Sequence, residues 1–377
     1  MEEFRFEKKN IIILSPEKWG KNHISKHHYA KELAKKNKVW FVESCGETKS
    51  NQSIVILDSE IQNLTIIKYR QTIKGRRFLP KKIISLLEKK IVGRILKKIG
   101  VKIDVVWSFD QFRFLNLNKF DAKIKIFHPV DITNSPSSLK SFIANSSDII
   151  FHVSDYIVED IQTKKPVYFI QHGLSEEFIN PIKIDKPKYI LENKINIGYV
   201  GNLISKFIDW ENLIKAIKEN QDVNFIFIGP YKGSNLSSNS LNKNEINILK
   251  GLNNVVLAGE MKSNEIASVI SYFDFLWLCY DTIKFKKEVS NSHKVIEYIS
   301  SGRPILSNKI LMYNDSDLII QCNNNSDFGK LVQDAIKNID KLKTESLSEK
   351  RKEFAKKNLY SNKINEIKEL INQTIEK

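Results

Sequence analysis

Short hydrophobic runs alternate with polar or amphipathic stretches through the first half of the chain. The runs are rich in β-branched and aromatic residues, and they occupy residues 10–14, 39–44, 103–109, 122–130, 147–154 and 166–172. Runs of this length and composition predict β-strands. Because stretches suited to helices separate them, the pattern favours a parallel, doubly wound α/β sheet.

The same alternation starts afresh in the second half. Predicted strands occupy residues 194–201, 223–230, 253–259, 273–280 and 303–308, and predicted helices occupy residues 209–220, 263–272 and 292–301. Between the halves, residues 176–194 contain prolines and many charges, which is typical of a linker. We therefore predict an N-terminal Rossmann-like domain over residues 1–175, the linker, a C-terminal Rossmann-like domain over 195–355, and a terminal helix over 356–377.

Composition agrees with two soluble domains. The 377 residues are 41% hydrophobic, which is enough for two cores. The three cysteines, Cys45, Cys279 and Cys322, show neither a disulfide framework nor metal-ligand spacing, so we expect a reducing, cytoplasmic compartment. The chain begins with charged residues and has no apolar run near the roughly 20 residues that a membrane span needs. We expect a soluble or peripheral protein.

The net charge of +16 is concentrated in one segment, residues 68–102, where Glu88 is the sole acidic residue. Within it, residues 81–100 carry Ile84, Leu87, Ile91, Ile95 and Ile99 at helical spacing, widened by Ile83, Leu86 and Val92. Such a helix can lie on the anionic inner face of a cell membrane. The residues expected to face the lipid are Lys81, Lys82, Lys89, Lys90, Arg94, Lys97 and Lys98. The alternative is an ordinary helix packed on the sheet, and the two interpretations are compatible.

Residues 291–306 hold the strongest local pattern. Asn291 or Ser292 is suited to cap a helix that ends at Gly302 and Pro304. A helix N-terminus favours an anion such as a diphosphate, and Lys294 adds a charge in the first turn. Glu297 lies one turn further on, where its carboxylate could accept hydrogen bonds from ribose hydroxyls. A capped helix with a Lys and a Glu also occurs widely as ordinary structure, so these residues alone are compatible with a nucleotide site without establishing one.

This segment resembles the donor-binding signature of retaining GT-B glycosyltransferases (family 4-like, glycosyl transferases group 1), in which a Lys and then a Glu precede a Gly-x-Pro turn. The resemblance implies two Rossmann-like domains facing each other across a cleft, with a C-terminal helix crossing back. It also implies that Glu297 binds the donor ribose. The other residues that it places at the donor are Gly201, Asn202, Lys206, Gly229, Gly259, Glu260, Met261, Ser292, His293 and Lys294.

The N-terminal half resembles bacterial cell-surface polysaccharide transferases of the same superfamily in the order of its segments. Residues 19–44 resemble the first loop and helix, which makes Gly20 an element of the acceptor side of the cleft. Residues 126–134 resemble the segment that carries a His and an Asp toward the cleft, so His128 and Asp131 are the candidates for contacting the transferred sugar or the acceptor hydroxyl. A structural role for each, as a loop residue bonded to the backbone, remains open.

The sequence departs from the family pattern at two positions. In the family a first glutamate is separated by seven residues from the second, which would place it at 289, where this chain has Val289, with Glu288 one place away. Glu288, Asn291 or backbone amides are the candidates to replace it. The arginine that usually follows the glycine of the diphosphate loop is replaced by Asn202. Lys206 and Lys294 are then the expected phosphate cations.

The resemblance implies transfer of a sugar from a UDP- or GDP-linked donor to a hydroxyl of a glycan or lipid-linked glycan. We expect a retaining reaction without a metal or other cofactor, because Lys206, Lys294 and the helix N-terminus can stabilise the leaving diphosphate. His23, His27 and His28 lack the partners of a metal site and are interpreted as loop and helix-surface residues.

Two alternatives remain. A sugar-nucleotide epimerase uses the same two-domain architecture. A nucleic-acid-binding protein would use the basic segment 68–102, although the sequence shows no recognisable nucleic-acid module and we expect no such partner.

Overall fold

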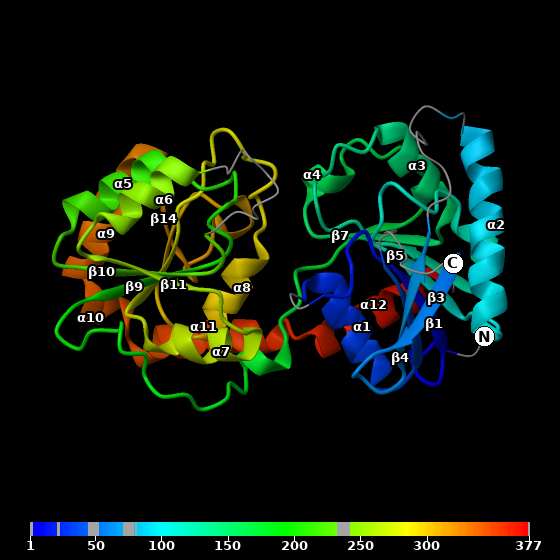
Figure 1. The fold of residues 1–377 in the computed structure, drawn as a ribbon, viewed down its shortest axis with the longest axis horizontal. Helices are drawn as coiled ribbons and strands as arrows, with labels where there is room; N and C mark the ends of the chain where they lie inside the picture. Colours follow the sequence, from blue (N-terminus) through cyan, green and yellow to red (C-terminus); the bar gives the residue numbers. More distant parts are fainter. Residues whose placement is uncertain are drawn as a thin grey trace. The chain divides into compact units, whose positions relative to one another are not determined.

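The computed structural model describes residues 3–20, 23–43, 53–70, 79, 81–231 and 242–375, apart from the side chains of Lys81 and Lys82. The chain divides into two compact units (Figure 1). The first comprises Met1–His172 with Tyr360–Lys377, and the second comprises Gly173–Leu359.

The first unit is built on a sheet that has eight strands among the described residues. These are β1 (Asn10–Leu14), β2 (Lys38–Val42), β3 (Ile54–Asp58), β4 (Leu64–Tyr69), β5 (Val105–Ser108), β6 (Ile124–Phe127), β7 (Ile149–His152) and β8 (Val167–Phe169). Their order is β3-β4-β2-β1-β5-β6-β7-β8. Neighbouring strands run parallel, except that β3 is antiparallel to β4.

Helices cover both faces of this sheet (Figure 1). On one face α1 (Ser25–Ala34) and α12 (Tyr360–Ile375) enclose a core with the rings of Tyr29 and Trp107, and α4 (Asp155–Val158) adds Ile157. On the other face α2 (Lys81–Ile99), α3 (Ser137–Ser146) and the short helix η2 (Leu117–Phe120) cover a second apolar layer. The terminal helix therefore belongs to the first unit, although the residues directly before it belong to the second.

The second unit has a parallel sheet of six strands in the part of the chain described. These are β9 (Asn196–Val200), β10 (Asn224–Ile228), β11 (Val255–Gly259), β12 (Phe275–Leu278), β13 (Ile305–Asn308) and β14 (Ile320–Cys322), in the order β11-β10-β9-β12-β13-β14. Since the chain moves outward from β9 in one direction and then resumes beside it with β12, the order reverses between these two strands. Ligands of doubly wound folds bind beyond the carboxyl ends of the strands at such a point.

Seven helices accompany this sheet in the described residues. They are α5 (Trp210–Glu219), α6 (Lys243–Lys250), α7 (Ser263–Val269), α8 (His293–Ser300), α9 (Phe328–Lys337), α10 (Ile339–Leu342) and α11 (Glu345–Lys357). α5 shows how the sequence sets a boundary, because Asp209 accepts a hydrogen bond from the backbone N–H of Asn212 and so caps the helix.

The expected strands are present, with three additions that the hydrophobic pattern did not indicate, β3, β4 and β14. The segment predicted as a linker packs in part against the second unit. Phe178 in η3 (Glu176–Phe178) and Ile190 are buried in the core of the second unit. Prolines and charges marked the segment as irregular, but these two apolar side chains pack it against the sheet.

Fewer apolar residues of helix α2 are buried than the sequence pattern suggests. Ile84, Val92 and Ile95 are buried, whereas Ile83 is 45% exposed and Leu86 is 60% exposed. Glu88, the acidic residue of this helix, is buried, where it accepts a hydrogen bond from the backbone N–H of Leu115 and pairs with Lys119.

Candidate functional site

Three glycines stand at the carboxyl ends of neighbouring strands in the second unit. Gly201 follows β9, Gly229 follows β10 and Gly259 ends β11. The backbone N–H of Gly201 donates to Ile228 (2.8 Å) and that of Gly229 donates to Gly259 (2.7 Å). Gly229 has φ +141°, and a Cβ there would lie 2.0 Å from the carbonyl oxygen of Gly201. Only glycine permits this backbone approach.

Lys294 lies against the first of these turns. A Cβ added to Gly201 would be 2.6 Å from Cε and 2.9 Å from Nζ of Lys294. Helix α8 is held to β9 by Tyr298, whose hydroxyl accepts a hydrogen bond from the N–H of Val200 (2.7 Å) and lies 3.2 Å from the carbonyl oxygen of the same residue. The N-terminus of α8 and its lysine are thereby fixed beside the end of β9, at the switch point of the sheet.

Lys294 and Glu297 form an ionisable pair on the first turns of α8. Both side chains are half-buried, and the described structure gives neither of their charged groups a hydrogen bond or an ion pair. Burial lowers the pKa of Lys294, and Glu297 opposes that shift. Burial raises the pKa of Glu297 to about 7, a shift that Lys294 opposes and Glu177 increases. The ammonium and the carboxyl group are both available to a ligand.

Glu177, which the sequence analysis did not single out, contributes to the electrostatic environment of Glu297. Its carboxylate accepts a hydrogen bond from Ser263 Oγ at the start of α7 (2.6 Å), which fixes η3 beside that helix. Its charge contributes to the raised pKa of Glu297. No local motif marks Glu177, because the proximity arises only after η3 packs on the second unit.

Lys206 lies on the loop after β9, and its role as a phosphate cation stays a prediction. Its exposed Nζ stands 5.3 Å from the ring centroids of both Phe207 and Phe285. The two rings meet edge to face, and Asp281 N–H donates to the Phe207 carbonyl (2.8 Å). Lys206 thus joins the loops that follow β9 and β12.

Asn202 occupies the position of the expected arginine. Its Oδ1 accepts a hydrogen bond from the N–H of Ile204 (2.8 Å), so the side chain shapes the turn after Gly201. At the other departure from the family pattern, Val289 is buried and Glu288 is exposed. A carboxylate at position 289 would be buried here, which explains why an apolar residue suits this chain.

The remaining predicted donor residues surround the same edge of the sheet. Glu260 is exposed after β11, and Met261 packs partly on the core of the second unit. Ser292 Oγ lies 3.3 Å from the hydroxyl of Tyr280, and His293 is exposed at the start of α8.

His128 is not at an open surface. Its ring is fully buried among the aromatic side chains of the first unit, 5.0 Å from the ring of Phe109. Trp107 Nε1 donates to His128 Nδ1 (3.3 Å), which places the histidine proton on Nε2, a buried atom with no hydrogen-bond partner in the described structure. Burial holds its pKa well below the usual value, so the ring is neutral. His128 is therefore a core residue in this structure, and its contact with a sugar stays a prediction.

Asp131 and Gly20, the other candidates of the first unit, are both exposed. Asp131 Oδ2 lies 3.5 Å from Nζ of Lys26, a buried lysine at the start of α1 that also pairs with Glu17 (2.6 Å). Asp131 can still contact a ligand, since its side chain is 61% exposed.

The three histidines near α1 do not all lie at the surface as expected. His27 is buried; its Nδ1 accepts from the N–H of Ile24 and its Nε2 donates to the carbonyl of Lys18. His28 stacks on Tyr360, with ring centroids 5.1 Å apart. Burial lowers the pKa of His27 to about 4 and that of His28 to about 3. Within the described residues, no three His, Cys, Asp or Glu side chains are grouped as a metal site requires.

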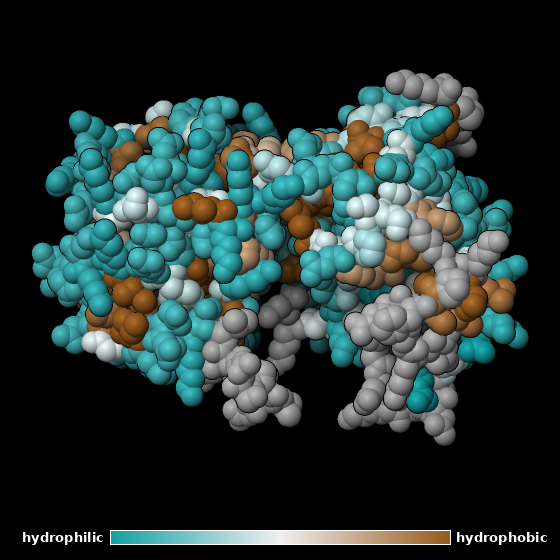
Figure 2. All heavy atoms as spheres, turned by 90° about the horizontal axis from the view of Figure 1, so that it is seen from above, coloured by the Kyte–Doolittle hydropathy of each residue, from teal (hydrophilic) through white to brown (hydrophobic). Residues whose placement is uncertain are grey.

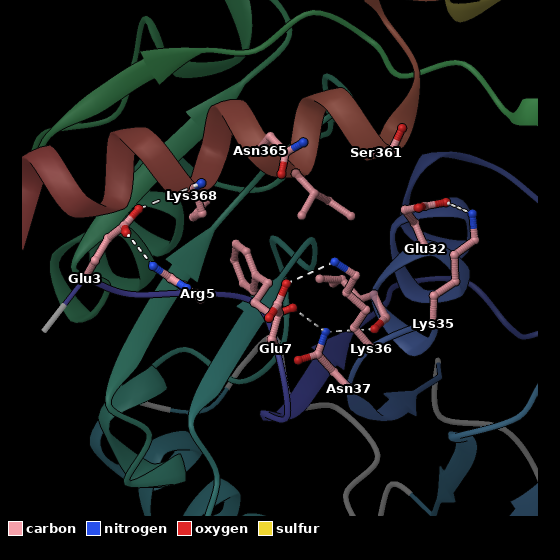
Figure 3. A pocket seen from close by; sticks show the side chains of 13 residues that line it. Glu3, Arg5, Glu7, Glu32, Lys35, Lys36, Asn37, Ser361, Asn365 and Lys368 are labelled. Atoms are coloured by element: carbon pink, nitrogen blue, oxygen red, sulfur yellow. Dashed lines mark hydrogen bonds and ion pairs between the residues drawn. The ribbon is translucent and has the colours of Figure 1, made fainter.

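A pocket of about 450 Å³ lies in the first unit, between the N-terminal segment, the end of α1 and α12 (Figure 3). Its charged side chains pair with one another: Arg5 with Glu3, Lys36 with Glu7 and Lys35 with Glu32. Lys368 shares Glu3 with Arg5. The lining residues include none of the predicted site residues.

Known proteins resemble this chain in fold but not detectably in sequence. No protein-family model matches the sequence, and no curated protein matches it. The fold, in contrast, matches solved structures along nearly its whole length. Sucrose-phosphate synthase from Thermosynechococcus elongatus is 11% identical, with 98% of this chain and 99% of that chain covered and a TM-score of 0.70. The chain has the GT-B fold.

Two further GT-B structures are similar. HepE from Anabaena, solved with UDP and glucose, is 13% identical, with 97% of this chain and 99% of that chain covered and a TM-score of 0.65. A glycosyltransferase from Rickettsia africae is also 13% identical, with 98% and 99% covered and a TM-score of 0.65. These neighbours are glycosyltransferases and not epimerases. At such low identity the likeness shows the GT-B fold and leaves substrate and mechanism to chemical argument.

Proposed function

We propose that this GT-B protein is a glycosyltransferase that takes its sugar from a UDP- or GDP-linked donor bound by the second unit. The observation that carries the proposal is the placement of Lys294 against the Gly201 turn, at the N-terminus of α8 and the switch point of the sheet. An ammonium and a helix N-terminus directed at one place favour a diphosphate there.

In the proposed complex, the donor diphosphate lies between the glycine turn and α8. Glu297, one turn further along the helix, accepts hydrogen bonds from ribose hydroxyls. In the transfer step the bond between the anomeric carbon and the diphosphate oxygen breaks, while the acceptor oxygen bonds to the anomeric carbon. The acceptor's proton passes to a phosphate oxygen of the leaving group. Lys294 and the helix dipole stabilise the charge that develops on that group.

The finer features rest on the resemblance described above. They are retention of configuration, independence of a metal, and an acceptor that is a glycan or lipid-linked glycan in bacterial cell-surface synthesis. Attack on the face from which the diphosphate leaves is compatible with a phosphate oxygen as base, and it requires no protein nucleophile. Asp131 is the exposed residue of the first unit that we assign to the acceptor side.

We also propose that the protein works in the cytoplasm. Cys279 and Cys322 are buried free thiols, and burial, with the charge of Asp209 adding to the shift, raises the pKa of the Cys279 thiol. Cysteines that do not form a disulfide framework are typical of proteins from reducing compartments.

Calorimetry with UDP-, GDP-, ADP- and dTDP-sugars tests the proposed function. We expect one nucleotide class to bind, and incubation of that donor with glycan acceptors to release the nucleoside diphosphate. Release of a free epimer of the donor in the absence of acceptor would instead favour an epimerase. Absence of binding by the whole panel would refute the proposal.

A further inference from the structure

Helix α2 places all the cations of its described side chains on the outside of the first unit. Lys89, Lys90, Arg94, Lys97 and Lys98 are exposed. Glu88, the acidic residue of the helix, is turned inward, where it accepts from the backbone N–H of Leu115 (2.9 Å) and pairs with Lys119 (3.3 Å). The outer face of α2 is therefore cationic without a carboxylate of its own.

The first turns of this face are apolar. Ile83 and Leu86 are 45% and 60% exposed, while Ile84 on the opposite side is buried in the core. Along the helix, the exposed positions Ile83, Leu86, Lys90, Arg94 and Lys97 recur every three or four residues, so they form one stripe. The stripe runs from Ile83 to Lys97, a length of about 21 Å at the usual helical rise, over most of a 19-residue helix.

A different face of α2 packs on the core of the first unit. Val92 and Ile95 are fully buried against the sheet together with Ile84. The helix thus has one side that completes the core and another that carries apolar and basic side chains into solvent. On the surface seen in Figure 2, hydrophobic residues lie in small patches among hydrophilic ones. Other large apolar side chains are exposed as well, and Ile83 and Leu86 are distinguished by lying on one stripe with basic residues.

We propose that the outer face of α2 docks on an anionic lipid surface. The basic stripe complements acidic headgroups, and Ile83 and Leu86 enter the boundary of the acyl chains. Lipid fits better than nucleic acid because a phosphate backbone would meet the basic residues but would leave the two apolar side chains in water. Among the described residues no helix is long and apolar enough to cross a membrane, so the docking is peripheral.

Sedimentation of the full chain with vesicles tests this proposal. The vesicles contain either phosphatidylcholine alone or phosphatidylcholine with phosphatidylglycerol, and no sugar nucleotide is present. We expect binding to the anionic vesicles that weakens with salt, since a Debye length of about 10 Å at 0.1 M screens surface charge. We expect no binding to the neutral vesicles. Because the measurement omits the donor, it stands apart from the proposed transferase activity.

Two variants separate the contributions of the basic and the apolar side chains to vesicle binding. K90Q/R94Q/K97Q should lower partitioning by about a hundredfold, since each basic residue near an anionic surface contributes roughly fivefold. I83S/L86S should lower it by about tenfold through the apolar contact alone. The matched control is K218Q/K337Q/K341Q, which removes three exposed lysines from the second unit and should bind as the wild type does.

Several outcomes would overturn the proposal. They are absence of binding to anionic vesicles, equal loss in the control variant, and unchanged binding in both α2 variants. Salt-sensitive binding of single-stranded nucleic acid that K90Q/R94Q/K97Q removes, without vesicle binding, would assign the face to nucleic acid instead. All replaced side chains are exposed, and an unchanged Tm confirms that each variant remains folded.

Discussion

The backbone of Gly201 and the side chain of Lys294 occupy adjoining space, so that a single methyl group at position 201 would overlap the lysine. This contact joins the end of the first strand of the second unit to the helix that follows the switch point. It places a flexible ammonium where a doubly wound fold binds its ligand. The account of donor binding depends on it.

Gly201→Ala should displace Lys294 and weaken binding of the nucleotide-sugar donor by about tenfold, since a misplaced charge-assisted contact costs about 1.5–3 kcal/mol. Calorimetry with the donor measures the loss. The control is Gly93→Ala, because Gly93 lies in α2 with open space around its Cβ position. That variant should bind normally and gain about 0.5–1 kcal/mol of stability from a better helix former. Equal donor affinity in both variants would contradict the contact.

Glu297→Gln should stabilise the protein at alkaline pH while weakening donor binding. The folded state raises the pKa of this carboxyl from 4.5 to about 7, so its protonated form favours folding below pH 4.5 and that contribution is lost as the pH rises to about 7. Glutamine cannot ionise and should add stability on the order of 1 kcal/mol at pH 8, a figure reduced for the partial exposure of the group.

Thermal unfolding at pH 4 and pH 8 measures this difference. The control is Glu192→Gln, because that side chain is 90% exposed. A variant less stable than wild type at pH 8 would show that the raised pKa of Glu297 is absent. In the wild type, donor affinity should increase from pH 6 to pH 8 as the carboxylate that accepts ribose hydrogen bonds forms.

Lys294→Gln and Lys206→Gln should differ in their effect on turnover. Lys294 stands at the proposed diphosphate site, and its loss should lower kcat by about a hundredfold, as removal of one donor to a developing charge does. Lys206 lies over Phe207 and Phe285, so its replacement should cost about 0.5–1 kcal/mol of stability with a smaller change in kcat. A larger kcat loss for Lys206→Gln would show that Lys206 moves to the phosphate during the reaction.

His128→Phe should destabilise the first unit at neutral pH by about 1–3 kcal/mol, because Trp107 Nε1 loses its buried acceptor. The difference from wild type should shrink on acidification. The pKa of His128 is lowered in the folded state, so the stability that its neutral ring contributes is lost as the pH falls below the ordinary value of 6.5. Unfolding curves from pH 7 to pH 5 test this, and a constant difference would contradict it.

The doubly wound sheets were predictable because buried parallel strands such as residues 10–14 and 224–228 are continuous apolar runs. Strand β3 was not, since an antiparallel edge strand beside a parallel sheet has a mixed pattern and Ile56 and Leu57 are exposed. The burial of two residues in the predicted linker could not be predicted for a related reason. Phe178 and Ile190 are single apolar residues in a polar segment, and their burial depends on tertiary packing.

Within the site, sequence located Lys294 and Glu297 because a helix start has a recognisable signature. It did not locate Glu177, whose influence on Glu297 passes through space between η3 and α8. Nor could it show that Lys206 rests on two aromatic rings from different loops, or that His128 sits inside an aromatic core. Each of these depends on contacts between segments far apart in the chain.

The most direct test of the central claim compares the affinity of the nucleoside diphosphate with that of its nucleoside, for wild type, Lys294→Gln and Lys206→Gln. Wild type should bind the diphosphate far more tightly. Lys294→Gln should lose about tenfold or more of that preference while binding the nucleoside normally, as expected for a charged hydrogen-bond donor, and Lys206→Gln should retain most of it. An unchanged preference in Lys294→Gln would contradict the proposed position of the donor diphosphate.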